Sequence, residues 1–214
     1  MRSASLGMGR VDPAHRLRFL NGLDVEIDGD RLAVRAHQHA FERFFASGVA
    51  ELKEKLGPIN WQFMPTKTFD PVDFAGFLKL LPRRVEGQAI RHAIELRHDS
   101  FRTADVVALA RDYGVAIVLA GDTHYPQIAD PTAPFVYARI MGTTETAPLG
   151  YAGKDLDRWV ARARLLASGR IPADLARVGK AATAKTGRDV FLYVISGFKE
   201  RNPAAAMAII EQLT

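Results

Sequence analysis

Apolar and polar positions repeat with two different periods along the chain, and these periods predict alternating strands and helices. Short apolar runs that stand between turn residues are typical of strands, and some of them alternate with charged residues. Longer segments place apolar residues at helical spacing with polar residues between them. Strands are predicted over 59–65, 92–98, 115–120, 135–141 and 189–195.

Helices are predicted between these strands, and several have clear signals at their ends. Asp70 followed by Pro71 is a typical start, because Asp caps free backbone N–H groups and Pro fits the first turn. A Gly after the last apolar position, as at Gly114, is typical of a helix end. The predicted helices run from Gln38 to Gly57 with a break at Gly48, from Asp70 to Leu81, from Ser100 or Thr103 to Gly114, over 154–167, and from Pro203 to the C-terminus.

The first forty residues have a weaker pattern. Residues 23–27 alternate like a strand, and the Asp-Gly-Asp at 28–30 predicts a turn into a second short strand over 31–35. Residues 7–15 combine Gly, Pro and charge, which is typical of disordered segments. We therefore divide the chain into a weakly patterned segment, 1–40, with one or two short strands, and one α/β domain over 41–214.

The composition limits the class of protein. With 214 residues, 48% of them apolar, the chain can bury a core, and none of its apolar runs reaches the roughly 18 residues that span a bilayer. The absence of cysteine excludes disulfides, thiolate catalysis and Cys-based metal sites. Residues 1–7 lack the apolar centre of a secretory signal. We expect a soluble, cytoplasmic protein with no membrane partner.

The net charge is +5, and it comes from 21 Arg and 8 Lys against 24 acidic residues. A basic balance can indicate a nucleic-acid or phosphate partner. The Arg residues are scattered, however, which favours a solvated surface of biased composition. Nucleic-acid binding is therefore an alternative and not the first interpretation.

The order of the predicted elements indicates a parallel α/β fold. Repeated βα units of this size are typical of a doubly wound sheet or of a (β/α)8 barrel. No Gly-x-Gly-x-x-Gly follows a predicted strand, which argues against a dinucleotide cofactor. Several predicted strands end in polar residues, as barrel strands do at their active-site face. The pattern favours a TIM-type barrel and leaves the cofactor unknown.

Four blocks of the sequence resemble the YecE-like (DUF72) family in their order and spacing. They cover 56–65, 95–101, 135–140 and 190–193, and the string Glu-Leu-Arg-His-Asp-Ser-Phe at 95–101 is the most specific. The resemblance runs from about residue 40 to the C-terminus and implies a TIM-type barrel in a soluble bacterial protein. It implies no activity, because the family is one of unknown function. The barrel is similar in outline to those of endonuclease IV and xylose isomerase, which is an analogy of fold only.

The sequence departs from this family's pattern at both ends. The usual Gly-Thr-Ser-Gly-Trp strand and the next strand with its Glu and Asn are missing from the first forty residues. Arg139-Ile-Met-Gly142 stands where the family often has Arg-Leu-His-Gly, and Ile195-Ser196 stands where it often has an Asn pair. We therefore expect a barrel that is incomplete or atypical at its N-terminus, with a sheet edge that a homodimer could cover.

The candidate site residues are those that such a barrel would gather at one mouth. Glu95 and Arg97 share a face of one strand, and Tyr137 and Arg139 share a face of another, because side chains alternate along a strand. The residues between Tyr137 and Arg139 and on either side of them are predicted to face the helices. The full set of candidates is Gln62, Glu95, Arg97, His98, Asp122, Tyr137, Arg139 and Ser196.

Three interpretations of Glu95 stay open. Charged residues on a covered strand are costly unless they pair or face a polar pocket, so Glu95 can form a buried ion pair with Arg97 or Arg139. The arginines can also bind a carboxylate or phosphate of a ligand in a bidentate fork. The third interpretation is a general base, which neighbouring arginines oppose because they favour the charged carboxylate.

Other chemistry has weaker signals. His98 is a candidate for proton transfer and, beside Ser100, also for a cap. Glu95, His98, Asp122 and His124 have side chains that bind zinc, manganese or magnesium, but no spaced motif such as His-Glu-x-x-His joins them, and we predict no metal. No Gly-x-Ser-x-Gly is present, so the serines are interpreted as caps or turn residues.

Three functions follow from these residues. The first is a barrel that binds a small anionic or phosphorylated ligand, in which Arg97 and Arg139 hold the anion and Glu95 and His98 transfer protons. Tyr137 and Gln62 orient the ligand, and Asp122 also binds it. The second is a nucleic-acid-binding or phosphodiester-cleaving protein, and the third is a non-catalytic interaction protein. Whether the protein is an enzyme stays open.

Overall fold

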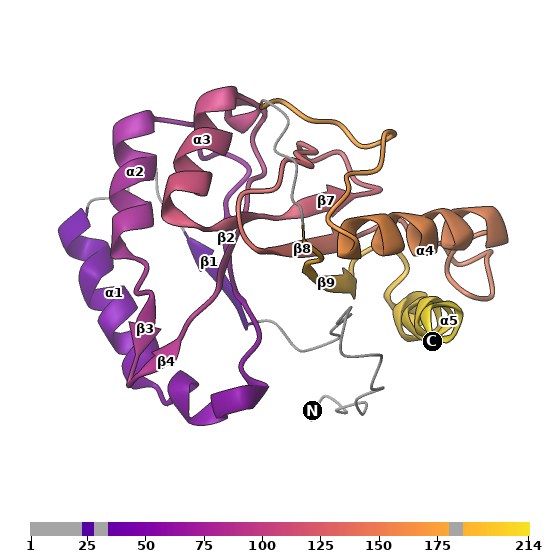
Figure 1. Cartoon of the computed structure of the whole chain (residues 1–214), viewed down its shortest axis with the longest axis horizontal. Helices are drawn as coiled ribbons and strands as arrows, with labels where there is room; N and C mark the ends of the chain where they lie inside the picture. The colour runs from indigo at the N-terminus through magenta and orange to yellow at the C-terminus, as the bar shows by residue number, and fades with distance from the viewer. Residues whose placement is uncertain (1–22, 28–33, 180–185) are drawn as a thin grey trace.

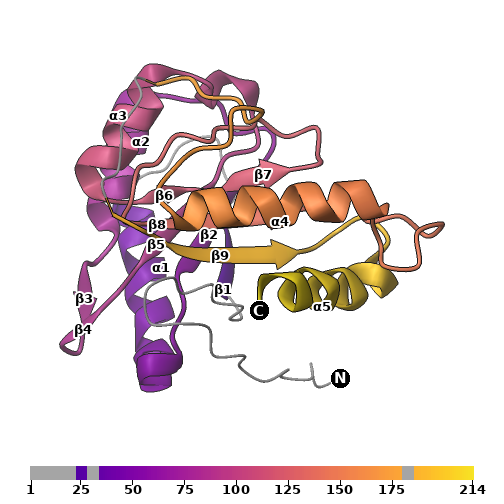
Figure 2. The ribbon, with the colours of Figure 1, turned by 45° about the vertical axis from the view of Figure 1, so that its right-hand side comes forward.

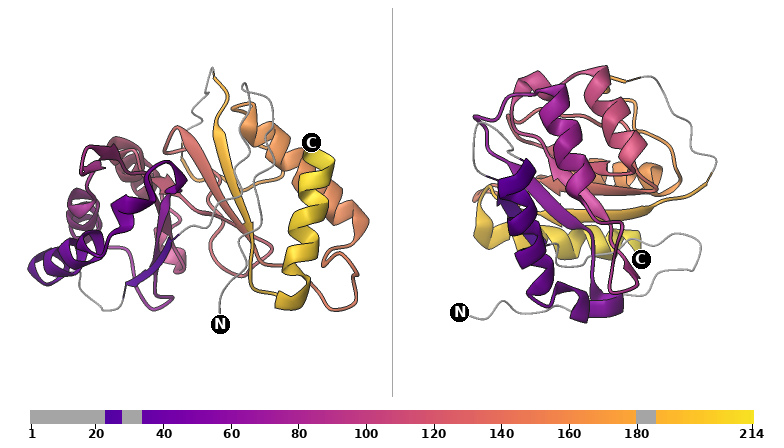
Figure 3. Two further views of the ribbon diagram at one scale, coloured as in Figure 1. Left: turned by 90° about the horizontal axis from the view of Figure 1, so that it is seen from below. Right: turned by 90° about the vertical axis from the view of Figure 1, so that its left-hand side faces the viewer.

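The computed structural model describes residues 23–27, 34–179 and 186–214, and the side chains from residue 40 on. It is a mixed α/β structure in which strands lie between two groups of helices (Figure 1). Helices α1 to α3 lie on one side, and α4 and α5 lie on the other (Figure 3, left). No helix in the described ranges is long and apolar enough to cross a membrane.

The strands form two parallel sheets and a small hairpin. The first sheet has the order β1-β2-β5-β6 and the second the order β7-β8-β9. Within each parallel sheet, the strands therefore lie side by side in the order in which they occur along the chain. In a doubly wound sheet, by contrast, the strand order reverses partway across the sheet. The strands are β1 Leu23–Ile27, β2 Ile59–Phe63, β5 His92–Glu95, β6 Ala116–Ile117, β7 Leu119–Gly121, β8 Phe135–Ile140 and β9 Asp189–Val194, with the antiparallel hairpin β3 Arg84–Val85 and β4 Gln88–Ala89.

One continuous stretch of chain joins the two sheets. β6 pairs with β5 and β7 pairs with β8, and Val118 alone separates them. The Val118 N–H still donates to the carbonyl of Ile94 on β5 (2.9 Å). The segment 116–121 therefore pairs with β5 of the first sheet before Val118 and with β8 of the second sheet after it.

Helices α2 and α3 begin and end where the sequence signals predicted, whereas the first helix begins at Val34, before the predicted Gln38, and continues after Gly48 as a 3₁₀ turn. Asp70 accepts from Asp73 N–H at the start of α2, and Thr103 accepts from Val106 N–H at the start of α3. Gly114 ends α3 in the left-handed conformation, which glycine adopts without strain. The helices are α1 Val34–Ala46, α2 Pro71–Leu80, α3 Ala104–Tyr113, α4 Gly153–Ala167 and α5 Asn202–Leu213, with 3₁₀ turns η1 Val49–Lys55, η2 Asp99–Phe101 and η3 Lys199–Arg201.

Two apolar cores lie between the strands and the helices. Trp61 and Phe63 of β2 pack with residues of α1, α2 and α3 in the first core. Ala138 and Ile140 of β8 pack with Trp159 of α4 in the second. Figure 2 shows α4 beside β8 and β9, with α5 next to it. The prediction that 136, 138 and 140 face helices is confirmed by this second core.

The opposite side of the strands, called here the inner face, has a different composition. Its apolar part is a separate cluster that includes Phe135, Tyr137 and Phe191. At the amino ends of the strands, the Arg91 guanidinium lies over the Phe191 ring at 4.7 Å and pairs with Asp189 at 3.1 Å. At the carboxyl ends, the inner face becomes charged.

Several expectations need correction. Val34 and Arg35 begin α1, so the second strand predicted over 31–35 is wrong at those residues; 31–33, like 7–15, lie outside the described ranges. The helical spacing of the Phe residues extends toward the N-terminus and overrides the short alternation. Ser100 accepts from Phe69 N–H instead of capping α3 (2.7 Å). The described sheets are not closed, so a complete TIM barrel is not confirmed.

One buried pair ties the first sheet to its helices. The Trp61 indole N–H donates to His92 Nδ1 (3.0 Å), and His92 Nε2 lies 2.8 Å from the carbonyl of Pro82. Because an indole can only donate and a carbonyl can only accept, the ring is neutral with its proton on Nε2. Burial lowers the pKa of His92 from its ordinary value of 6.5 to about 4.

This pair predicts a loss of stability in mild acid. The unfolded chain binds a proton at His92 below pH 6.5 and the folded chain does not until about pH 4, so the free energy of unfolding falls as the pH falls through that window. The gap between the two pKa values corresponds to about 3 kcal/mol. His92→Gln, which keeps one acceptor and one donor, should flatten the dependence by that amount in urea titrations at pH 4 to 7. The exposed His124→Gln is the control, and equal curves for the two variants would contradict the assignment.

Candidate functional site

The polar candidates come from facing positions on neighbouring strands. Gln62 on β2 is the register partner of Glu95 on β5, and Arg139 on β8 is the partner of Tyr193 on β9. Arg97 follows two residues after Glu95 and therefore points to the same side. Since all these strands are parallel, their carboxyl ends lie at one edge, and the polar side chains meet there.

Glu95 forms the centre of a buried charged group. Its side chain is fully buried. Glu95 Oε1 accepts from Arg97 Nε (2.8 Å), and Oε2 accepts from Arg139 Nη1. Gln62 Oε1 accepts from Arg97 Nη2 and from Arg139 Nη1 (3.1 Å). Asn60 Nδ2 lies 3.5 Å from Glu95 Oε2. The structure thus brings Gln62, Glu95, Arg97 and Arg139 together as one group.

Both arginines of this group hold their guanidinium groups largely out of water. The Arg97 side chain is 16% exposed and that of Arg139 is 8% exposed. A buried guanidinium is costly unless acceptors surround it, and Glu95 and Gln62 supply acceptors to both arginines.

Arg97 connects this group to an aromatic ring at the surface. Its guanidinium lies 4.6 Å from the centre of the Tyr125 ring. Tyr125 belongs to the loop after β7, and its ring packs against His124 at 4.3 Å. A cation over an aromatic face is attracted by the ring's electron density. Tyr125 therefore holds Arg97 in place from the side of the loop.

An open hollow of about 670 Å³ lies at the carboxyl ends of the second sheet. Tyr125 lines it, so the hollow and the Glu95 group share this residue as a wall. Its other lining residues come directly after β7, β8 and β9. They are Asp122, Thr123, His124, Met141 and Ser196.

Asp122 is held at the edge of this hollow by two donors. Trp159 Nε1 of α4 donates to Asp122 Oδ2 (2.6 Å). Tyr151 also hydrogen-bonds Asp122, and its hydroxyl accepts from Gly142 N–H (2.9 Å). Burial, followed by the charge of Asp122, raises the pKa of Tyr151 above its ordinary value, so Tyr151 stays protonated and donates to the carboxylate.

The remaining candidates lie in other surroundings. His98 caps η2, where Nδ1 accepts from Ser100 N–H (3.2 Å) and lies 2.9 Å from Ser100 Oγ. Tyr137 is buried on the inner face and stacks on Tyr193, with ring centres 4.9 Å apart. His98 is therefore built into a turn, and Tyr137 into the apolar wall. Their predicted roles in a ligand site are not tested by these contacts.

In the described ranges, no three His, Asp or Glu residues gather as metal ligands. Asp122 and His124 both line the hollow, whereas the Glu95 carboxylate is occupied by its two arginines. The four residues considered for a metal are therefore not assembled into one site.

Three residues of the site were missed in the sequence. Trp159 and Tyr151 hold Asp122, and Tyr125 covers Arg97. Trp159 has the helical spacing of a core residue, and its indole N–H gives no signal in a sequence. Tyr151 and Tyr125 lie in loops without periodicity. A polar aromatic residue close to a strand end is the one sign that could have indicated them.

The fold and this site define a class of protein: a parallel α/β protein with a polar site at the carboxyl ends of its strands. Comparison with protein families is more specific. A family model described as "Protein of unknown function DUF72" matches residues 17–214. The chain belongs to the DUF72 family, as the resemblance of its four sequence blocks implied.

A solved structure supports the fold. A DUF72 family protein from Thermotoga maritima MSB8, TM1631, is similar with a TM-score of 0.58 and 13% sequence identity. The likeness covers 89% of this chain and 71% of that one. At this identity it concerns the fold alone. A search of curated proteins gave no match.

The Glu95 group predicts a strong effect of a single neutral substitution. Glu95→Gln removes the buried carboxylate that pairs with both guanidinium groups, and breaking one side of a buried ion pair costs about 3 kcal/mol or more. Urea unfolding should show this loss, and the added change Arg139→Gln should cost less in the variant than in the native protein. Asp155→Asn, in the more exposed pair with Arg158, is the control and should cost less than about 1 kcal/mol. Equal losses for Glu95→Gln and Asp155→Asn would show that the group is not stabilised as described.

Proposed function

We propose that the protein binds a small anionic or phosphorylated ligand in the hollow at the carboxyl ends of its strands. The observation behind the proposal is the Arg97 guanidinium, which is 16% exposed and contacts Tyr125, a residue that lines the hollow. An anion in the hollow would lie close to this cation. Arg guanidinium groups suit this task, because their planar donors match carboxylate and phosphate oxygens.

Arg97 is the residue best placed to meet the anion. In the described part of the chain its Nε and Nη2 donate to Glu95 and Gln62, and no protein acceptor faces Nη1. Arg139 is more deeply buried and donates to the same two residues. We assign the direct contact with the anion to Arg97, and to Arg139 a nearby positive charge that attracts the anion.

The other predicted residues take supporting roles in this proposal. Gln62 and Glu95 fix the guanidinium planes, and Tyr137 forms the wall below them. Asp122 contacts the part of the ligand that lies in the hollow. If the protein catalyses a reaction on this ligand, Glu95 and His98 remain the candidates for proton transfer, with hydrolysis or isomerisation ahead of redox chemistry.

We propose further that the two sheets belong to a TIM-type barrel. The strand order along the sheets supports this, since each strand adds to the edge left by the one before, as barrel strands do. The gathering of polar side chains at the carboxyl ends also supports it. A homodimer across the sheet edge, and a cytoplasmic location, stay predictions from the sequence.

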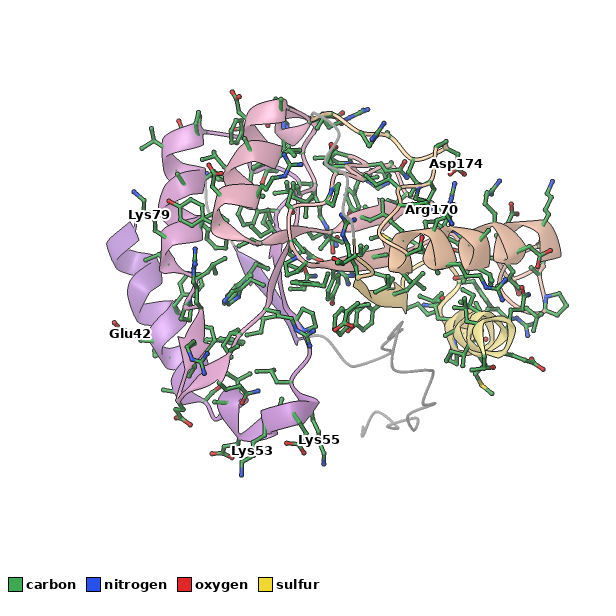
Figure 4. All side chains as sticks on the ribbon, in the orientation of Figure 1. Glu42, Lys53, Lys55, Lys79, Arg170 and Asp174 are labelled. Carbon is green, nitrogen blue, oxygen red and sulfur yellow. The ribbon has the colours of Figure 1, made fainter. Side chains whose placement is uncertain are left out.

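Nucleic-acid binding is not favoured by a particular feature. It rests on the net charge of +5, and the labelled charged side chains of Figure 4 are spread over the outer surface. Lys53 and Lys55 lie on η1, and Lys79 lies on α2 with Glu42 on the neighbouring helix. A nucleic-acid interface would gather such cations on one face and lose affinity steeply with salt.

The proposed ligand class predicts an anion-dependent stabilisation that needs Arg97. Inorganic phosphate at about a hundred times its dissociation constant should raise the melting temperature by about 5–10 °C over chloride of equal ionic strength. Arg97→Gln should abolish this difference, and calorimetric titration should show no binding. Arg102→Gln makes the same charge change on an exposed residue five positions away and should keep the full shift. A shift of equal size in both variants would mean that phosphate acts elsewhere.

A further inference from the structure

Asp122 is an exposed carboxylate that the protein holds in a costly backbone conformation. Its φ is 54°, in the left-handed region that residues other than glycine rarely adopt. Ser196, which also lines the hollow, has φ 56°. Strained residues that gather at one site are typical of functional positions, because the surrounding structure must hold them there.

Neighbouring glycines make room for this arrangement. A Cβ on Gly142 would lie 2.6 Å from Asp122 Cβ, and a Cβ on Gly121 would lie 2.4 Å from the Trp159 ring. Both distances are shorter than real Cβ contacts allow, so larger residues would displace Asp122 or its donor. The strand ends are therefore shaped to bring Asp122, Trp159 and Tyr151 together.

The donors fix the carboxylate from the protein side. Trp159 is fully buried and Tyr151 is 7% exposed, whereas Asp122 itself is exposed. Trp159 is held in turn by the Arg162 guanidinium, 4.4 Å from its ring, and Arg162 pairs with Asp174 (2.7 Å). A carboxylate has about four acceptor positions, and the two donors leave others open to the hollow.

The hollow offers several more hydrogen-bonding groups. Thr123, His124 and Ser196 line it beside Asp122, and Met141 is the apolar exception among its lining residues. The Ser196 backbone is fixed, because its carbonyl accepts from Asn202 Nδ2 (3.1 Å) and Thr143 Oγ1 (3.3 Å). Such a lining fits a ligand with several hydroxyl groups better than an apolar one.

We propose that the ligand is a phosphate ester that carries free hydroxyl groups, such as a polyol or sugar phosphate, and that Asp122 accepts hydrogen bonds from those hydroxyls. This inference rests on the proposed function, in which the phosphate lies near Arg97. Trp159 and Tyr151 are positioning residues, because they hold the carboxylate without meeting the ligand. The positive charge of Arg97 and the fixed negative charge of Asp122 give the ligand one orientation.

Glycerol phosphate and propyl phosphate provide the test, because they share three carbons and one phosphate and differ in two hydroxyl groups. Calorimetric titration of the native protein should show glycerol phosphate binding about ten-fold more tightly than propyl phosphate. Equal affinities would overturn this inference and leave the phosphate site intact. No binding of either ester, or of inorganic phosphate, would overturn the proposed function itself.

Variants assign the preference to Asp122. Asp122→Asn keeps the shape and tolerates the left-handed backbone, since Asn is also enriched there, and should lose the ten-fold preference. It should bind propyl phosphate at least as tightly as the native protein, because the change also removes a negative charge near the phosphate. Tyr151→Phe removes one hydroxyl and should reduce the preference, whereas Tyr113→Phe on α3 should not. A variant that merely unfolds would weaken both esters alike. A full preference in Asp122→Asn would place the hydroxyl contacts on other residues.

Discussion

The buried pairing of one carboxylate with two guanidinium groups is the constraint on which the site depends. Glu95 lies on a strand that is covered on both sides, where an unpaired charge would cost several kcal/mol. Arg97 comes from the same strand and Arg139 from β8, across the point where the two sheets meet. The ion pairs therefore tie the first sheet to the second. An apolar replacement of similar size could be as stable, so stability alone does not account for these charges.

The two faces of the strands differ in composition, and this difference allows the charged group to be buried. Apolar burial against α1 to α3 and against α4 and α5 supplies most of the favourable free energy of folding. The inner face is therefore free to carry polar groups at its carboxyl end, while Arg91 and the Phe135 cluster close its amino end. At Val118 the chain passes from the first sheet to the second. The hollow lies at the carboxyl end of β7, the strand that follows Val118.

Much of this arrangement can be predicted from the sequence because it repeats. Alternation along 92–98 and 135–141 assigns each residue to a face, and the caps at Asp70 and Thr103 are local. The Glu95 group follows from this alternation and from the meeting of parallel strands at their carboxyl ends. The break at Val118 and the hairpin after α2 depend on contacts between distant segments, which no local pattern records. The same is true of Trp159, whose spacing is that of a core residue although its indole N–H serves Asp122.

The two candidate carboxylates, Glu95 and Asp122, differ in their exposure to solvent. Glu95 is fully buried and both of its oxygens accept from guanidinium groups, so proton transfer to Glu95 would require an ion pair to break first. Asp122 is exposed at the hollow, and its two donors hold it still while leaving acceptor positions open. A group that meets ligand hydroxyls must have such positions. For the ligand proposed above, the geometry therefore favours Asp122 for the hydroxyl contacts and Glu95 for holding Arg97 and Arg139 in place.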